Sequence, residues 1–348
     1  MSNGNGRPAY QERVIHFAAG DGFPLNLINV RGDSAPTRGP VLLVHGAGVR
    51  ASIFRAPVEV TLVDALVAEG YDVWLENWRA SIDLPPNLWT LDQAALHDHP
   101  RAVQRIVEET GQSEIKAVIH CQGSTSFMMS AVAGLVPEVK AIVSNAVSLH
   151  PVLPSWSVSK LRYAIPTFQP ILPYLNPQWG DSAPGFLPKL VAQAVKLTHH
   201  ECDNPVCKMV SFVYGTGFPA LWEHANLNDA THRWLNAEFG MVPMTFFRHI
   251  ERCERNGSLV NVIETDRLPK SYTDQAPRTD ARFSFLAGAL NKCFLPESQQ
   301  RTFDHFEKHA PGRHFLHVFP GYSHLDIFMG KNAGRDIFPT ILQELAAS

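Results

Sequence analysis

The stretch Ala117–Ser124, which reads AVIHCQGS, decides the fold prediction. It starts as the apolar run of a buried β-strand, and Gly123 stands two places after Cys121. A strand that turns abruptly into a helix holds the side chain between them in strained geometry at the carboxyl edge of a sheet. An isolated cysteine is more often a buried structural residue, but this position predicts a nucleophile. The N-terminus of the following helix is expected to favour the thiolate and to lower the Cys121 pKa below about 8.5.

Strand-like and helix-like segments alternate on both sides of this turn. The expected strands are 13–19, 24–30, 41–44, 71–75, 115–120, 139–147, 281–290 and 314–319. The expected helices are 57–69, 90–110, 124–135, 296–309 and 336–346, with a kink or a new start at Pro100. Continuous apolar strands separated by amphipathic helices predict an α/β protein with a mostly parallel sheet and helices on both faces.

The alternation stops after His150 and returns only near residue 275. The intervening stretch is rich in proline, aromatic residues and histidine, and no strand repeat is evident in it. We therefore expect a split core, 1–150 and 275–348, interrupted by a mostly helical cap over 151–274. Most of the aromatic side chains of the cap are expected in its own core, and a few could roof an apolar pocket above Cys121.

Composition narrows the function classes. The chain has 348 residues, 45% of them hydrophobic and 18% charged, with a formal net charge of −3, which is typical of a soluble globular protein. It shows no lysine and arginine cluster for nucleic acid, and no apolar run of about 18 residues for a membrane span. The first residues are polar and the five cysteines are scattered, so we expect no disulfide framework and a cytoplasmic location.

The partners of Cys121 are expected in two later loops. In a strand–turn–helix enzyme of this kind, the acid follows a late strand and the histidine follows the last one. His324 comes directly after the strand 314–319, and Asn291 stands where the carboxylate is expected. A thiolate beside an imidazolium already balances its charge, so an amide could suffice to orient the ring. Asp326 and Glu297 are the alternative orienting residues.

An oxyanion site needs backbone N–H groups directed at developing negative charge. Gln122, the residue after the nucleophile, is the natural first donor. The loop His45–Gly48 follows a buried strand and offers Ala47 as the second donor, although a turn that simply needs two glycines would look the same.

No metal or organic cofactor is predicted. The run His199–Cys202 together with Cys207 contains zinc-type ligands, but its spacing fits no familiar tetrahedral set, and the two cysteines could pair or simply pack. His97–His99 is expected on a solvated helix face. No Gly-x-Gly-x-x-Gly motif follows an early strand, so the chain offers no flavin site.

These motifs together resemble the α/β-hydrolase superfamily. Stretches similar to the acid lipase group are 72–79, 91–98 and 110–112. A closer resemblance is to the α/β-hydrolase-like domain found beside cholesterol-oxidase-type (GMC) flavin oxidoreductases, carried by 120–124, 202–207, 291–298, 321–326 and 330–332. The resemblance implies the fold and a possible oxidoreductase partner, but no particular substrate. Ile119, Cys121 and Asn291 depart from the small residue, serine and aspartate usual in the wider superfamily.

Three functions remain open at this point. The first is an acyl-transfer hydrolase that uses Cys121, His324 and Asn291 on a small hydrophobic ester, lactone or thioester. The second is an acyltransferase or cyclase that works through the same cysteine thioester. The third is a non-catalytic module that partners an oxidoreductase.

Overall fold

The computed structural model describes residues 10–215, 217 and 221–347. An eight-stranded sheet forms its centre, in the order β1-β2-β4-β3-β5-β6-β9-β10. The strands are β1 (Gln11–Ala18), β2 (Pro24–Arg31), β3 (Pro40–Val44), β4 (Asp72–Asn77), β5 (Ile115–His120), β6 (Val139–Asn145), β9 (Arg282–Gly288) and β10 (Phe315–Phe319). β2 pairs antiparallel with β1 and β4, and the pairs from β4 to β10 are parallel. The prediction of a mostly parallel sheet is confirmed.

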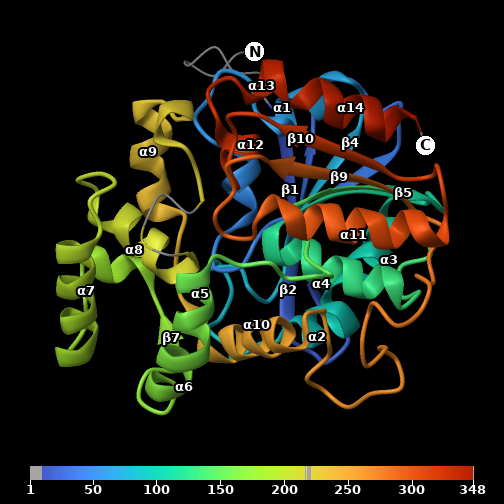
Figure 1. Ribbon diagram of the computed structural model, residues 1–348. Coiled ribbons are helices and arrows are strands. Elements are labelled where there is room, and N and C mark those ends of the chain that lie inside the picture. The colour runs from blue at the N-terminus through green and yellow to red at the C-terminus, as the bar shows by residue number, and fades with distance from the viewer. Residues whose placement is uncertain (1–9, 216, 218–220, 348) are drawn as a thin grey trace.

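Helices cover both faces of the sheet, as the alternating pattern predicts (Figure 1). On one face α1 (Leu62–Ala68) contacts β4, and α14 (Phe338–Ala346) contacts both β6 and α1. On the other face α3 (His99–Thr110) contacts β3, α4 (Cys121–Val132) contacts β5 and α11 (Pro296–His309) contacts β9. The remaining short helices of the core are η1 (Ala51–Arg55), α2 (Leu91–Gln93), η2 (Ala94–Asp98), α12 (Asp326–Met329) and α13 (Ala333–Asp336).

Strand register brings two predicted site loops together. β3 and β5 are parallel neighbours in which Val44 pairs with Ile119, so the loop that starts at His45 and the turn at Cys121 leave the sheet side by side. Gly288 of β9 likewise pairs with Phe319 of β10, and the segments that carry Asn291 and His324 follow. The carboxyl edge of the parallel strands therefore gathers all the predicted catalytic residues, as expected for an open α/β sheet.

The helix expected at 90–110 has an irregular middle. α2 passes without a break through the π-helical turn η2 into α3, and Pro100 lies in the first turn of α3. The kink or new start predicted at Pro100 corresponds to this change of helix type. The expectation of a solvated face at His97–His99 is wrong, because Asp98 and His99 are fully buried.

These buried polar groups are satisfied by partners that lie far away in the sequence. Asp98 accepts hydrogen bonds from the Arg79 guanidinium at 2.6–3.0 Å. His99 has Glu76 at 3.0 Å from Nδ1 and Ser126 at 2.7 Å from Nε2. A buried charge is tolerated where such partners compensate its loss of water.

The chain between β6 and β9 is mostly helical (Figure 1, green to orange). It contains α5 (Ser155–Ser159), η3 (Lys160–Ala164), α6 (Ile165–Phe168), η4 (Pro177–Gly180), α7 (Phe186–Thr198), α8 (Pro205–Tyr214), η5 (His224–Asn226), α9 (Asp229–Trp234), η6 (Leu235–Ala237) and α10 (Met244–Asn256), with the strand pair β7 (Tyr174–Leu175) and β8 (Val242–Pro243). The cap boundaries 151–274 stay a prediction.

Among the described residues, no helix combines the length and the apolar character that crossing a membrane requires.

Candidate active site

Cys121 lies on a strand-to-helix turn. β5 ends at His120 and α4 begins at Cys121, whose φ of 56° is in the left-handed region that L side chains rarely adopt. Such a conformation costs on the order of 1–3 kcal/mol and persists only where the surroundings enforce it. Gly123 makes the turn possible, because a Cβ atom there would lie 2.0 Å from the His45 carbonyl oxygen.

Two backbone N–H groups converge on the Cys121 sulfur. They belong to Gln122 and Ala47, the residues predicted to stabilise an oxyanion, and each lowers the pKa of the thiol by donating toward it. Gly46 allows this approach, since a Cβ atom there would lie 3.2 Å from Sγ. The loop is also held from the cap, where the Tyr214 hydroxyl donates to the Ala47 carbonyl at 2.9 Å.

His324 lies close to the Cys121 sulfur, and Asn291 lies beside the His324 ring. One ring nitrogen of His324 is within 4.8 Å of Cys121 Sγ. The His324 Nδ1 atom is 3.1 Å from the Asn291 side-chain nitrogen, whereas Nε2 is buried and has no hydrogen-bond partner within the described part of the chain. The three residues proposed as a triad are thus close together in the order that the chemistry needs.

The orientation of the Asn291 amide determines the tautomer of this histidine. The Cys293 backbone N–H donates to Asn291 Oδ1 at 2.9 Å, so the amide NH₂ group faces His324 Nδ1. An NH₂ group can only donate, and Nδ1 must therefore accept, which places the proton of a neutral ring on Nε2. A carboxylate at 291 would instead accept a proton from Nδ1 and support the imidazolium.

Burial keeps both reacting groups neutral. It raises the pKa of the Cys121 thiol to about 12, against the smaller opposite effect of the two N–H groups. It lowers the pKa of His324 to about 3. The expectation of a thiolate is therefore wrong for this closed arrangement, because the loss of water outweighs the helix N-terminus and its N–H donors.

The cavity at Cys121 is small, apolar and covered by the cap. Its volume is about 40 Å³, and Cys121 itself is only 6% exposed. Tyr214, Phe246 and Phe247, which lie within the predicted cap, are among its lining residues, in line with the expected roof, and Phe294 lines it from outside the cap. Sites for drug-sized ligands have volumes of about 300–1,000 Å³. An acyl substrate therefore requires the cap to move away from Cys121.

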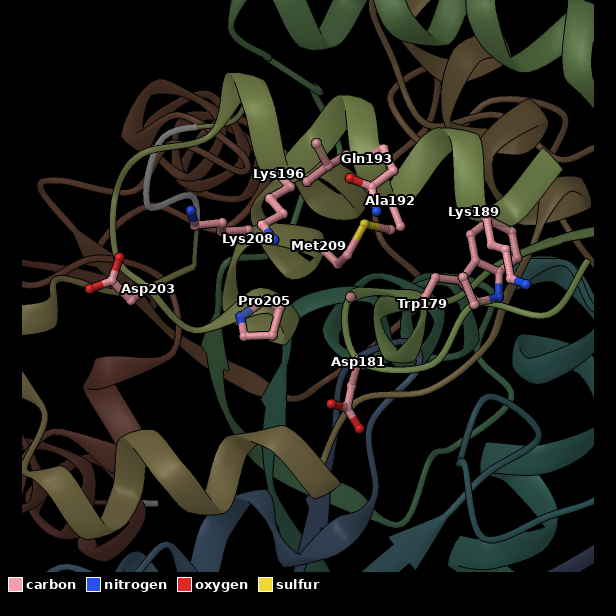
Figure 2. Close-up of a pocket in the computed structure, with 13 residues that line it drawn as sticks. Trp179, Asp181, Lys189, Ala192, Gln193, Lys196, Asp203, Pro205, Lys208 and Met209 are labelled. Atoms are coloured by element: carbon pink, nitrogen blue, oxygen red, sulfur yellow. The ribbon is translucent and has the colours of Figure 1, made fainter. Parts of the chain in front are cut away.

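A larger hollow of about 460 Å³ lies elsewhere in the cap, between η4, α7 and α8. Figure 2 shows the charged side chains Lys196, Lys208 and Asp203 around it, with Trp179 and Met209 also in its lining. It contains neither a cysteine nor a histidine, so its lining offers no thiol–imidazole pair for acyl transfer.

Two neighbours of the triad were not anticipated from the sequence. The His120 ring lies 4.8 Å from the His324 ring, centroid to centroid. Asn145 donates to His120 Nδ1 at 2.9 Å and to the His324 carbonyl at 3.1 Å, and so links the two histidines. Burial and then the charge of His324 lower the pKa of His120 well below its usual value. The position of His120 next to Cys121 was the available signal.

Lys160 also lines the cavity, and its side chain is half-buried. Its ammonium donates to the carbonyl oxygens of Phe212, Val213 and Gly215 at 2.5–3.1 Å, where α8 ends. Burial lowers its pKa to about 8. Its position satisfies the terminal carbonyl groups of that helix, a role that no local sequence pattern indicates.

The alternative orienting residues contact other groups. Asp326 accepts from the Ser323 N–H at 2.9 Å and from the Asn226 side chain at 2.6 Å, and burial raises its pKa to about 6. Glu297 forms an exposed ion pair with Arg301 at 2.6 Å along α11. Asp326 thus fixes the loop that carries His324, and Asn291 is the residue at its Nδ1 atom.

Comparisons with known proteins agree with this architecture. Residues 39–186 match the family model described as alpha/beta hydrolase fold. A monoacylglycerol lipase of Paleococcus ferrophilus has a similar structure, with a TM-score of 0.56 and 16% identity over 97% of this chain and 99% of that one. The protein has the α/β-hydrolase fold.

Sequence relatives point to lipases and esterases. Sterol esterase 2 of Saccharomyces cerevisiae is 26% identical over an alignment of 157 residues that covers 38% of this chain and 29% of that protein. Human lipase member K is 32% identical over an alignment of 122 residues that covers 30% of this chain and 31% of that protein. The chain thus covers about three tenths of the length of these curated relatives. It is an α/β-hydrolase-fold protein with homologues among lipases and esterases.

Proposed function

We propose that this protein is an acyl-transfer hydrolase that acts on a hydrophobic carboxylic ester, lactone or thioester through Cys121. One observation carries the proposal: the N–H groups of Ala47 and Gln122 both donate toward the Cys121 sulfur. Cys121 lies on a strained turn, and its sulfur is within 4.8 Å of a His324 ring nitrogen. Two donors and a nucleophile at one point are what a tetrahedral intermediate needs. The esterase and lipase names of the relatives support the same class.

The first half-reaction requires the cap to open. The substrate carbonyl oxygen then takes the two N–H donors, each worth roughly 2.7–4 kcal/mol of barrier. In the open site, water moves the ring proton of His324 from Nε2 to Nδ1, and Asn291 turns its amide so that Oδ1 accepts a hydrogen bond from that Nδ1–H. The freed Nε2 atom then takes the thiol proton. The sulfur bonds to the carbonyl carbon, and collapse of the intermediate breaks the bond to the leaving group, which receives that proton.

The second half-reaction releases the acyl group. Nε2 of His324 takes a proton from water, and the hydroxide oxygen attacks the thioester carbon over the same two N–H groups. The carbon–sulfur bond breaks, the proton returns to sulfur and a carboxylic acid leaves. An amine, a thiol or an internal carbanion could replace water, which gives the acyltransferase or cyclase alternative. Transfer products that form only when such an acceptor is added would favour that alternative.

The direct test is turnover of chromogenic acyl esters of increasing chain length. Cys121→Ala and His324→Ala should abolish turnover while the far-ultraviolet circular dichroism spectrum stays unchanged. Rates equal to that of the unmodified protein in both variants would reject the assignment of these residues.

A second candidate function is a non-catalytic module that partners an oxidoreductase. The neutral thiol and the Asn291 amide directed at Nδ1 favour it, because both oppose proton transfer from Cys121 to His324. Mild iodoacetamide separates the two functions. Selective, pH-dependent alkylation of Cys121, detected by intact mass, supports the enzyme, and an inert thiol supports the binding module. The oxidoreductase partner and the cytoplasmic location stay predictions.

A further inference from the structure

Four zinc-type ligands meet in the cap, outside the candidate active site. We call Cys202, Cys207, His224 and His232 the cap Cys/His cluster; their ligand atoms all lie within 4.8 Å of one another. Cys207 Sγ is 3.3 Å from His224 Nε2, and Cys202 Sγ is 3.9 Å from His232 Nε2. Both cysteines are free thiols, so no disulfide explains why they are neighbours.

The spacing of these atoms fits a tetrahedral metal ion. Zinc bonds sulfur at about 2.3 Å and imidazole nitrogen at about 2.05 Å, so a tetrahedral site separates the two kinds of ligand by about 3.6 Å. The two observed sulfur–nitrogen distances, 3.3 and 3.9 Å, bracket that value. Two cysteines and two histidines also form one of the common closed sets of structural zinc sites.

We propose that the cap Cys/His cluster binds one Zn²⁺ ion in a closed, structural site. The two thiols lose their protons to solvent as the ion binds, and the two thiolates balance its charge. The sequence prediction of no metal depended on the spacing around His199–Cys202. Neither His199 nor His200 belongs to the cluster, and the actual histidine ligands lie further along the chain.

Local structure presents each ligand. The Asn204 side chain caps α8 by accepting from the N–H groups of Val206 and Cys207 at 3.0 and 3.1 Å, which fixes the turn between the two cysteines. His224 begins η5, and His232 lies in α9. Cys202 lies in the loop before α8, so a loop and three helices supply the ligands, and an ion would join them.

The cluster is connected to both halves of the candidate active site. α8 carries Cys207 near its start and Tyr214 at its end, and Tyr214 holds Ala47. The segment that carries His224 contacts the His324 loop, where the Leu325 N–H donates to Leu221 at 2.6 Å. Asn226 also donates to Asp326 at 2.6 Å. A bound ion would thus fix the two cap segments that hold these catalytic loops in place.

Metal content of the purified full chain is the first test. We expect about one zinc per chain by elemental analysis of protein purified under reducing conditions. The Cys202→Ser and His232→Asn variants should lose at least nine tenths of it. His200→Asn, which removes an exposed histidine two residues from Cys202, is the matched control and should keep it.

Metal replacement in the unmodified protein provides a test that needs no variant to fold. After removal of zinc, Co²⁺ should bind with a stoichiometry of one and give the absorption bands of a tetrahedral thiolate site. Zn²⁺ should protect Cys202 and Cys207 from alkylation. Absence of these bands, together with equal alkylation of both cysteines with and without Zn²⁺, would overturn the proposal. These readouts do not depend on turnover, so they stand apart from the test of the acyl-transfer proposal.

Discussion

Two clusters in this chain contain the same kinds of side chain in different surroundings. At the carboxyl edge of the sheet, Cys121 lies with His120 and His324, all three buried. In the cap Cys/His cluster, two cysteines and two histidines meet, and only Cys207 is fully buried. The first cluster has one sulfur with two backbone N–H groups directed at it, whereas the second has two sulfurs.

This difference shows why ligand type alone does not determine chemistry. Two thiolates can neutralise a divalent cation, and four ligands close its coordination sphere. A single thiolate would leave a net positive charge in a dry cavity, at high electrostatic cost. The N–H donors around Cys121 instead suit a transient oxyanion. We therefore expect the first cluster to perform acyl transfer and the second to hold a metal.

Removing the Cys121 sulfur should separate the two clusters most sharply. Cys121→Ala should lower kcat/KM on a chromogenic ester by on the order of 10⁴-fold or more, as loss of a catalytic nucleophile does. Its zinc content should stay at that of the unmodified protein. Cys253→Ser, which changes a buried cysteine in α10 outside both clusters, is the control for activity and metal. Loss of zinc in Cys121→Ala would show that the metal binds at Cys121 and not at the cap Cys/His cluster.

Removing the metal should have the next largest effect, and it should act on stability. A ligand that binds only the folded state at about 1,000 times its Kd adds roughly 4 kcal/mol to the free energy of unfolding. Chelation should therefore lower the melting temperature of the unmodified protein by several degrees, as measured by calorimetry. Cys207→Ser should melt at the lower temperature with or without chelator. A chelator effect of the same size in Cys207→Ser would contradict a structural metal there.

Sequence patterns predicted the strands and helices of the core well, but they did not predict the protonation state of Cys121 in the candidate active site. The strand 115–120 and the helix 296–309 occur as predicted, because apolar period and length specify such elements locally. Cys121, Asn291 and His324 could be chosen because the ends of successive parallel strands share one edge of a sheet. The neutrality of the thiol could not be predicted, since it depends on cap residues such as Phe246 that are distant in sequence.

The cap Cys/His cluster was even harder to predict from the sequence. Its ligands come from a loop, α8, η5 and α9, and seven residues separate His224 from His232, so no local motif connects them. The orientation of the Asn291 amide is a further example, because the backbone N–H of Cys293 determines it. Both features arise from tertiary contacts, which composition and periodicity do not encode.

Acidification should lower the free energy of unfolding, because His324 of the candidate active site is buried in its neutral form. His324 has a pKa of about 3 in the folded protein, below the unfolded value of about 6.5, so the unfolded state binds the proton first. The stability that depends on a neutral His324 is therefore complete above pH 6.5 and is lost as the pH falls toward 3. At pH 5 the free energy of unfolding should already be lower by about 2 kcal/mol. Urea unfolding of the unmodified protein should give a lower free energy of unfolding at pH 5 than at pH 7. In His324→Gln this decrease should be smaller by about 2 kcal/mol. Equal declines would contradict the burial argument.

The smallest expected effect on activity concerns Asn291, which stands beside His324 where a carboxylate is usual. Asn291→Asp should raise kcat/KM by about tenfold, because the new carboxylate can accept from His324 Nδ1 and still accept from the Cys293 N–H. It should also raise the pKa of His324 toward its ordinary value, since a nearby negative charge favours the imidazolium. The pH–rate profile should therefore gain a fall in rate below about pH 6 that the unmodified enzyme lacks. Asn291→Ala is the matched control, because it removes the amide without adding charge. If Asn291→Asp is as slow as Asn291→Ala, then the amide is not what restrains proton transfer, and the opening of the cap over Cys121 becomes the step that limits the reaction.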